Sequence, residues 1–180
     1  MKGIVFNLLE EVVTLHHGAD IWDQILDQAD VAGIYTSLGS YPDEEMSQLV
    51  NTTANLLALQ PNDLTLWFGR HAIPLLVDRY PYFFTADSTR SFLLSLNSII
   101  HPEVRKVYNA ASVPIFDFHD AEDNVLVMGY RSERKLCALA QGFSEGAADH
   151  YGEVIDFKHV SCMHHGDDKC LFHISFSKTC

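Results

Sequence analysis

The chain has 180 residues, of which 47% are hydrophobic, and its 24 acidic and 12 basic side chains give a formal net charge of -12. This composition suits one globular domain with a sizeable core, and the negative charge argues against binding nucleic-acid phosphates or anionic membranes. No apolar run is long enough to cross a membrane, and Glu10 and Glu11 interrupt the N-terminal apolar stretch that a signal peptide would need. We therefore expect a single cytoplasmic domain spanning residues 1–180.

The first half of the chain reads as a series of helices. Apolar residues recur at helical spacing over 3–17, and Gly18 is a natural stop for that helix. The pattern predicts further helices that start at or near the following residues: Asp20, Pro42, Asn62, and Asp87 or Ser88. Pro74 falls inside the fourth helix, so we expect a kink or break near Arg70. The last helix of this half runs into His101.

The second half shows strand patterns around one long helix. Four segments read as strands, the last two as a closing hairpin: 113–118, 125–130, 154–162 and 170–176. Between the two pairs, a helix is expected from Glu133 to about Tyr151, with Ser132 as its cap. The sequence therefore predicts an α+β fold with a helical N-terminal half and, in the C-terminal half, an antiparallel sheet with a long helix.

The segment Tyr130-Arg131-Ser132-Glu133-Arg134 is the first candidate site. If it is extended, Tyr130, Ser132 and Arg134 project from one face, because side chains alternate along a strand. Two hydroxyls and one guanidinium suit an anion, above all a carboxylate that arginine can hold through two hydrogen bonds. The alternative is a solvated strand end followed by a helix cap.

The second candidate is His101, which follows an apolar stretch and precedes Pro102. A neutral imidazole in such a helix could ligate a metal or a haem iron. The alternative is a hydrogen-bonded histidine of the core.

The third candidate is a set of three cysteines and one histidine. Its members are Cys137, His159, Cys162 and Cys170. Such a set closes a tetrahedral structural zinc site and leaves no open position. The alternative is ordinary buried thiols, with several of the nearby histidines as bystanders. Cys180 is terminal and is not expected to take part.

Together and in this order, these motifs resemble the H-NOX family, the haem-nitric oxide/oxygen-binding domains related to the sensor domain of soluble guanylate cyclase. The resemblance covers most of the chain, from Met1-Lys2-Gly3 to the terminal hairpin. Its most specific signature is His101 followed, 29 residues later, by Tyr130-x-Ser132-x-Arg134. The pieces Phe68-Gly69-Arg70 and Tyr80-Pro81-x-Phe83-Phe84 also fit the family.

The resemblance implies a b-type haem between the helical half and the sheet half. His101 would be the proximal iron ligand, and the tyrosine, serine and arginine of the motif would bind the two haem propionates. Pro114 matches a proline that packs against the haem and distorts it. Asp43 falls where some members place an acid that pairs with the motif arginine, Arg134.

The resemblance also bears on which gas is bound. Oxygen-binding members carry a distal tyrosine nine residues after the motif tyrosine, and this chain has Leu139 there. The other residues that match the distal pocket are also apolar: Val5, Leu9, Ile73 and Leu76. Bound oxygen takes on negative charge and gains from a hydrogen-bond donor, whereas nitric oxide on ferrous iron needs one much less. The family pattern therefore implies nitric oxide rather than oxygen.

Some bacterial members similarly carry a zinc site with cysteine and histidine ligands, and the set Cys137, His159, Cys162 and Cys170 matches it. Zinc-bound thiolates can be oxidised, so this site would add a redox response to the haem.

The resemblance finally implies a sensor with no catalytic residues, which must act through a partner because no catalytic domain follows. Stand-alone bacterial relatives regulate histidine kinases or cyclic-di-GMP enzymes (diguanylate cyclases and phosphodiesterases), and the acidic surface would suit a basic patch on such a partner. Three alternatives stay open: an oxygen-binding haem sensor or carrier, a zinc-thiolate redox sensor, and a zinc hydrolase. Four protein ligands and the lack of a His-Glu-x-x-His motif argue against the hydrolase.

Overall fold

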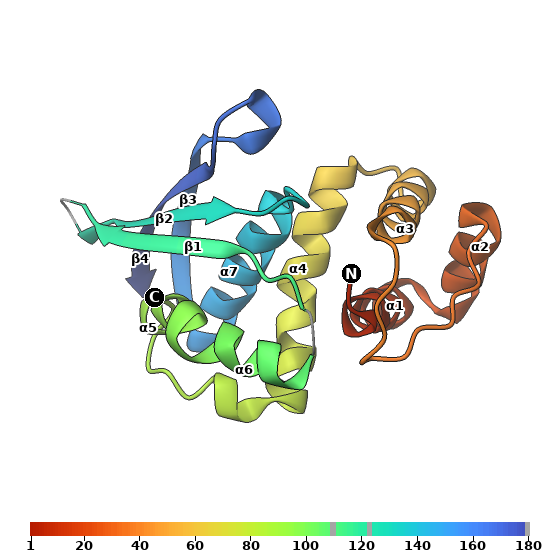
Figure 1. The fold of residues 1–180 in the computed structure, drawn as a ribbon, viewed down its shortest axis with the longest axis horizontal. Coiled ribbons are helices and arrows are strands. Elements are labelled where there is room, and N and C mark those ends of the chain that lie inside the picture. Colours follow the sequence, from red (N-terminus) through yellow and green to blue (C-terminus); the bar gives the residue numbers. More distant parts are fainter. Residues whose placement is uncertain (109–110, 122–123, 179–180) are drawn as a thin grey trace.

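The structure, a computed structural model, describes residues 1–108, 111–121 and 124–178. Figure 1 shows two groups of elements on either side of helix α4, with three helices in one group and the sheet with its covering helices in the other. The α+β fold expected from the sequence is confirmed. No helix in the described ranges is long and apolar enough to cross a membrane.

The N-terminal group consists of three helices: α1 (Gly3–His17), α2 (Ala19–Ala29) and α3 (Asp43–Leu56). Helix α1 ends at Gly18 as predicted, because Gly18 has a φ of 91° that residues with a side chain rarely adopt. Helix α3 begins with three acidic residues in its first turn, where carboxylates interact favourably with the helix dipole. Pro42, which was expected to be the first helical residue, is the N-cap instead, so α3 begins one residue later than predicted.

Helix α4 (Pro61–Arg79) runs unbroken past Pro74, so the break expected near Arg70 does not occur. A proline in a helix has no N–H to donate to the carbonyl four residues earlier, which here belongs to Arg70. A Cβ built on Gly146 would lie 2.5 Å from that carbonyl oxygen, so the neighbouring helix α7 (Cys137–Tyr151) packs directly against this turn of α4. Close helix packing thus accommodates the proline.

Three consecutive helical segments lead up to and past His101. They are α5 (Thr89–Ser95), the π-helical η2 (Leu96–Ile100) and α6 (His101–Val107), and the short η1 (Pro81–Phe83) connects them to α4. Ser88 caps α5, since its Oγ accepts a hydrogen bond from the N–H of Ser91 at 3.2 Å. Pro102 lies in the first turn of α6, directly after η2, and has no N–H to donate to the preceding helical turn.

The sheet has four antiparallel strands in the order β1-β2-β4-β3. The strands are β1 (Ile115–Asp120), β2 (Leu126–Arg131), β3 (Glu153–Ser161) and β4 (Cys170–Lys178). They match the four predicted segments to within two residues at each end. A register shift between His159 and Ser161 marks a bulge near the end of β3, and η4 (Met163–His165) follows it. Figure 1 shows α7 behind the sheet and α5 and α6 along its lower side.

Helix α7 begins at Cys137, four residues later than the predicted start at Glu133. The reason is a turn after β2, in which the N–H of Lys135 donates to the carbonyl of Ser132 at 3.0 Å. Lys135 adopts a left-handed conformation with φ of 50°, which a helix does not allow. Ser132 still acts locally, because its Oγ accepts from the N–H of Arg134 at 3.3 Å, but it caps this turn and not the helix.

Helices α4 and α7 approach each other so closely that only glycine fits at the crossing. A Cβ on Gly142 would lie 2.1 Å from the carbonyl oxygen of Leu66, and one on Gly69 would lie 2.8 Å from that of Leu139. Arg70 of α4 reinforces the crossing through Nε and Nη2, which donate to the carboxylate of Asp149 at 2.6 and 2.9 Å. The crossing fixes α7, and with it Leu139, against the central helix.

The buried apolar residues form two separate cores. One contains Phe6, Leu9 and Leu49 among others and lies between α1, α2, α3 and α4. The other contains Phe92, Phe116 and Phe172 among others and lies between the sheet, α5 and α7. The two cores belong to the two groups of elements in Figure 1. The division differs from the predicted one, because α5, which the sequence assigned to the helical half, packs against the sheet through Phe92 and Leu93.

Candidate functional site

His101 lies at the first position of α6, beside the sheet. Its ring stacks on that of Phe116 of β1, with ring centroids 5.6 Å apart and an interplanar angle of 23°. Its Nδ1 is buried and has no hydrogen-bond partner among the described residues, which argues against the reading as a hydrogen-bonded core histidine. Burial, followed by the charge of Arg105, lowers the pKa of His101 to about 4. The ring is therefore neutral at pH 7, the form that ligates a metal.

The motif residues Tyr130, Ser132 and Arg134 do not lie on one extended face, because β2 ends at Arg131 and the turn described above follows. Tyr130 is buried between the rings of Phe116 and Phe172, and burial raises its pKa. Arg134 points away from the sheet and across to α3. A strand ending in a turn thus brings the motif to the boundary between the two halves.

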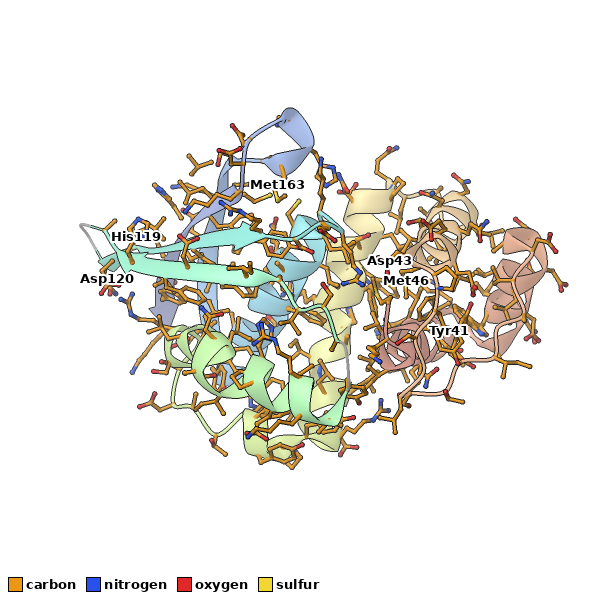
Figure 2. All side chains as sticks on the ribbon, viewed as in Figure 1. Tyr41, Asp43, Met46, His119, Asp120 and Met163 are labelled. Carbon is orange, nitrogen blue, oxygen red and sulfur yellow. The ribbon has the colours of Figure 1, made fainter. Side chains whose placement is uncertain are left out.

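Arg134 forms the main polar link across that boundary. Its Nε donates to Oδ2 of Asp43 at 2.8 Å, and its Nη1 donates to the carbonyl of Ser112 at 2.9 Å. The ammonium group of Met1 donates to the other oxygen of Asp43 at 2.6 Å. Burial raises the pKa of the Asp43 carboxyl, but these two cations outweigh it and hold the pKa below its usual range. Figure 2 labels Asp43 at the start of α3, and the pairing expected from the sequence is present.

The five residues that match the distal pocket come from three helices. They are Val5 and Leu9 of α1, Ile73 and Leu76 of α4, and Leu139 of α7. Leu9 and Ile73 are buried, and the other three are partly buried and pack against the N-terminal core. Each of the five is apolar, so these positions supply no hydrogen-bond donor from a side chain.

The residues around His101 fit a haem. The ring of His101 offers a neutral nitrogen with no hydrogen-bond partner among the described residues, and the guanidinium of Arg134 could bind a propionate. Pro114 is partly buried directly before β1, two residues from Phe116. The donor set therefore agrees with a haem held between α6, the end of β2 and the apolar side chains of α1, α4 and α7.

The three cysteines and one histidine come together at the base of the β3–β4 connection. One ligand atom from each of Cys137, His159, Cys162 and Cys170 lies within 4.8 Å of the others. The Sγ atom of Cys162 is 4.0 Å from that of Cys137 and 4.0 Å from that of Cys170. Tetrahedral zinc with Zn–S bonds of about 2.3 Å would place two sulfurs roughly 3.8 Å apart. The set therefore has the spacing of a tetrahedral metal site.

Without a metal ion, the protein around this cluster keeps the thiols of Cys137 and Cys170 protonated. Burial, with Cys170 and Cys162 close by, raises the pKa of Cys137 to about 12, and burial also raises the pKa of Cys170. A metal ion reverses this effect, because it stabilises the thiolate form that binds it. The N–H of Met163, labelled in Figure 2, donates to Sγ of Cys170 at 3.3 Å. His159 is exposed and borders a surface hollow of about 390 Å³, so solvent reaches the cluster from that side.

Sequence reasoning missed three residues that shape these sites. Phe116 supports the His101 ring, and the amide Nδ2 of Asn97 donates to the carbonyl of Phe116 at 2.8 Å, which ties η2 to β1. Asp167 accepts a hydrogen bond from the N–H of Cys162 at 2.8 Å and so shapes the loop of the cysteine cluster. The alternation of the predicted strand 113–118 places Phe116 and Phe118 on one face, but no local signal marks Asn97 or Asp167. Cys180 lies outside the described residues.

Both a family model and solved structures match this chain over most of its length. A family model described as haem-NO-binding matches residues 2–159. An H-NOX protein from Shewanella oneidensis in the Fe(II)NO ligation state superposes with a TM-score of 0.92 at 31% identity, and the match covers 99% of this chain and 100% of that one. The unliganded Fe(II) H-NOX protein from K. algicida superposes with a TM-score of 0.84 at 28% identity, covering 99% and 98%. With the match extending over nearly the whole chain, this protein belongs to the H-NOX family of haem-based gas sensors.

Proposed function

We propose that this protein is a nitric oxide sensor that binds haem b and regulates a separate signalling partner, and that it is not an enzyme. The single observation that carries the choice of gas is the apolar distal set, with Leu139 where an oxygen-binding relative would have tyrosine. A relative at 31% identity whose structure was solved with nitric oxide on ferrous iron supports the same choice.

The chain would hold the haem through residues from both halves. His101 would bind the iron, and Tyr130, Ser132 and Arg134 would bind the propionates. Pro114 would press on the ring from the sheet side. The haem would supply an iron that binds diatomic gases. Arg134 already contacts Asp43, so the residue that would hold a propionate also joins the two halves of the protein.

The distal residues would select nitric oxide because their side chains have no hydrogen-bond donor. Oxygen bound to iron carries partial negative charge, and a hydrogen bond to such an acceptor is worth about 1.5–3 kcal/mol. Leu9, Ile73 and Leu139 offer none, and the same is true of Val5 and Leu76. Nitric oxide needs a donor much less, so an apolar pocket costs it little. The oxygen-binding reading would need a donor that these five positions do not provide.

The signal would pass through His101, which would hold the iron and would lose that hold when nitric oxide is bound. His101 lies at the junction between the π-helical η2 and α6, and a shift at this junction would move α6 relative to the sheet. The two halves then take up a different relative placement, and a partner that contacts both reads the change. A histidine kinase or a cyclic-di-GMP enzyme in the cytoplasm is the partner class we propose, docked on the acidic surface through basic residues.

Cys137, His159, Cys162 and Cys170 would bind one structural zinc ion. Their spacing, with one ligand atom from each residue within 4.8 Å of the others, supports zinc over unrelated buried cysteines. Because the zinc would be closed by four protein ligands, it has no position for a water nucleophile and supports no hydrolase. Oxidation of the thiolates would give the protein a second, redox input, and peroxide added in the absence of nitric oxide tests whether that input alone changes partner activity.

The test of the proposed function is the absorption spectrum of the purified, reduced protein. We expect a Soret band from bound haem, no stable oxygen complex in air, and a shifted Soret band on addition of nitric oxide that shows loss of the histidine ligand. A stable oxygen complex in air would contradict the choice of nitric oxide and would indicate an oxygen sensor. A nitric oxide complex that keeps its histidine and still regulates the partner fully would show that His101 release is not the signal.

A further inference from the structure

A cluster of aromatic and histidine side chains forms where the C-terminal end of α1 meets α4, and none of its residues belongs to either site described above. His16 and His17 end α1, and Trp67 and His71 face them from α4. The rings of His16 and His71 are 4.5 Å apart between centroids, and both contact Trp67, at 5.3 and 4.9 Å. We propose that His16 and His71 bind a divalent transition-metal ion of the class that prefers imidazole: Ni²⁺, Cu²⁺ or Zn²⁺.

The distance between the two rings suits a shared ion. An imidazole nitrogen lies about 2.0–2.1 Å from such a metal, so the ring centroid lies about 3.2 Å from it. Two histidines at neighbouring coordination positions, with an angle between about 90° and 109° at the metal, then have centroids roughly 4.5–5.2 Å apart. The observed 4.5 Å corresponds to an angle of about 90° at the metal. Square-planar coordination has this angle, and Ni²⁺ and Cu²⁺ prefer it.

His71 is already oriented as a ligand. Its Nδ1 lies 2.8 Å from the carbonyl oxygen of Trp67, and because a carbonyl only accepts, Nδ1 carries the hydrogen. In the neutral ring the lone pair is therefore on Nε2. Metal-binding histidines commonly donate their second ring N–H to a carbonyl in this way, which fixes both the tautomer and the ring orientation. His71 is partly buried while His16 is exposed, so His71 would be the fixed ligand and His16 the adjustable one.

The site would be exchangeable and not structural. In the described part of the chain, the cysteine cluster is the one group of three or more potential ligands within reach of a common ion, so water would complete the coordination here. The net charge of -12 raises the local concentration of cations around the protein. An ion at this place would tie α1 to α4, as the ion pair between Arg79 and Glu11 at 2.8 Å also does. The inference does not depend on the proposed haem function.

The experiment is a calorimetric titration of the haem-bound protein with NiCl₂ at pH 7.5, with any histidine tag removed and the cysteine cluster loaded with zinc beforehand. We expect one Ni²⁺ ion to bind per chain while the zinc content stays constant. His16→Gln and His71→Gln should each weaken binding at least tenfold. His17→Gln is the matched control from the same turn of α1, and it should change the affinity by less than twofold to threefold.

Tryptophan fluorescence locates the ion. Bound Ni²⁺ should quench Trp67, which lies within about 5 Å of both rings, and should leave Trp22 of α2 unaffected. Trp67→Phe should therefore abolish the quenching while calorimetry still detects one ion. Unchanged binding in His16→Gln, or an equal loss in His17→Gln, would overturn the assignment. His16 is exposed, so His16→Gln tests the site even if His71→Gln fails to fold.

Discussion

Arg134 and Asp43 are 91 residues apart in the chain, and Nε of Arg134 donates to Oδ2 of Asp43 at 2.8 Å. The Met1 ammonium shares the same carboxylate, so one acidic group joins the N-terminus, α3 and the turn after β2. Arg134 is also the residue proposed to hold a haem propionate. The contact therefore couples the proposed haem site to the helical half of the protein.

We expect Asp43→Asn to lower the free energy of unfolding by about 1 kcal/mol near pH 7, a small effect because the Asp43 side chain is 44% exposed and the Arg134 side chain 24%. The folded-state pKa of Asp43 lies below the ordinary value of about 3.9. The advantage of the wild type is therefore fully present above about pH 4 and disappears as the pH falls through the folded-state pKa. Urea unfolding of both proteins between pH 3 and pH 8 measures it. A wild-type advantage that grew on acidification would contradict this reading.

His101→Gly should lose stable haem, because it removes the proposed iron ligand. Haem content per chain, measured from the Soret band after gel filtration, should fall to near zero and return when imidazole fills the space left by the ring. His173→Ala on β4 is the control and should retain haem. Normal haem content in His101→Gly without imidazole would exclude His101 as the ligand.

Zinc should be present at one ion per chain, whether or not haem is bound. Cys170→Ser should reduce zinc, measured by elemental analysis, by at least tenfold, because one of four ligands is lost and the remaining thiols are buried. His164→Gln should keep its zinc, since His164 lies outside the set of four ligands. Full zinc in Cys170→Ser, or four freely reactive thiols in the wild type, would reject the site.

Leu139→Tyr should raise the affinity for oxygen. The phenol would supply the donor that the distal residues lack, and about 1.5–3 kcal/mol for a hydrogen bond to a charged acceptor corresponds to tenfold or more. Leu139→Phe adds a ring without the hydroxyl and should leave oxygen binding as weak as in the wild type. Oxygen affinities from absorption spectra distinguish the two variants, and equal affinities would show that the hydroxyl has no role.

Gly142→Ala should destabilise the fold by about 1–3 kcal/mol, because the added Cβ would lie 2.1 Å from the backbone oxygen of Leu66 and force α4 and α7 apart. The neighbouring Gln141→Ala on α7 should change the free energy of unfolding by less than about 0.5 kcal/mol. Urea unfolding measures both. Equal stabilities would mean that the helices can separate without cost at this crossing.

The sequence determined the features that depend on short-range patterns. Apolar periodicity placed α1 and α3, the Ser88 cap placed α5, and alternation placed the four strands, because each depends on neighbouring residues and hydrogen bonds. It failed at the start of α7, where the left-handed Lys135 delays the helix, and at Pro74, which α4 contains without a break. In the second case the reason is tertiary, since α7 packs closely on this turn of α4 at Gly146 and supports a continuous helix.

The tertiary structure alone decided what meets at the sites. Motif spacing named His101 and Arg134, and the family resemblance named Asp43, but only the packing of the two halves brings Asp43 to Arg134 and Phe116 to the His101 ring. The four ligands Cys137, His159, Cys162 and Cys170 come from α7, β3, the turn after β3 and β4, and the bulge at the end of β3 is not visible in the sequence. Pairing of His16 with His71 likewise depends on how α1 lies against α4. Local patterns fix which groups a chain carries, whereas long-range packing fixes the distances between them, and the chemistry of a site depends on those distances.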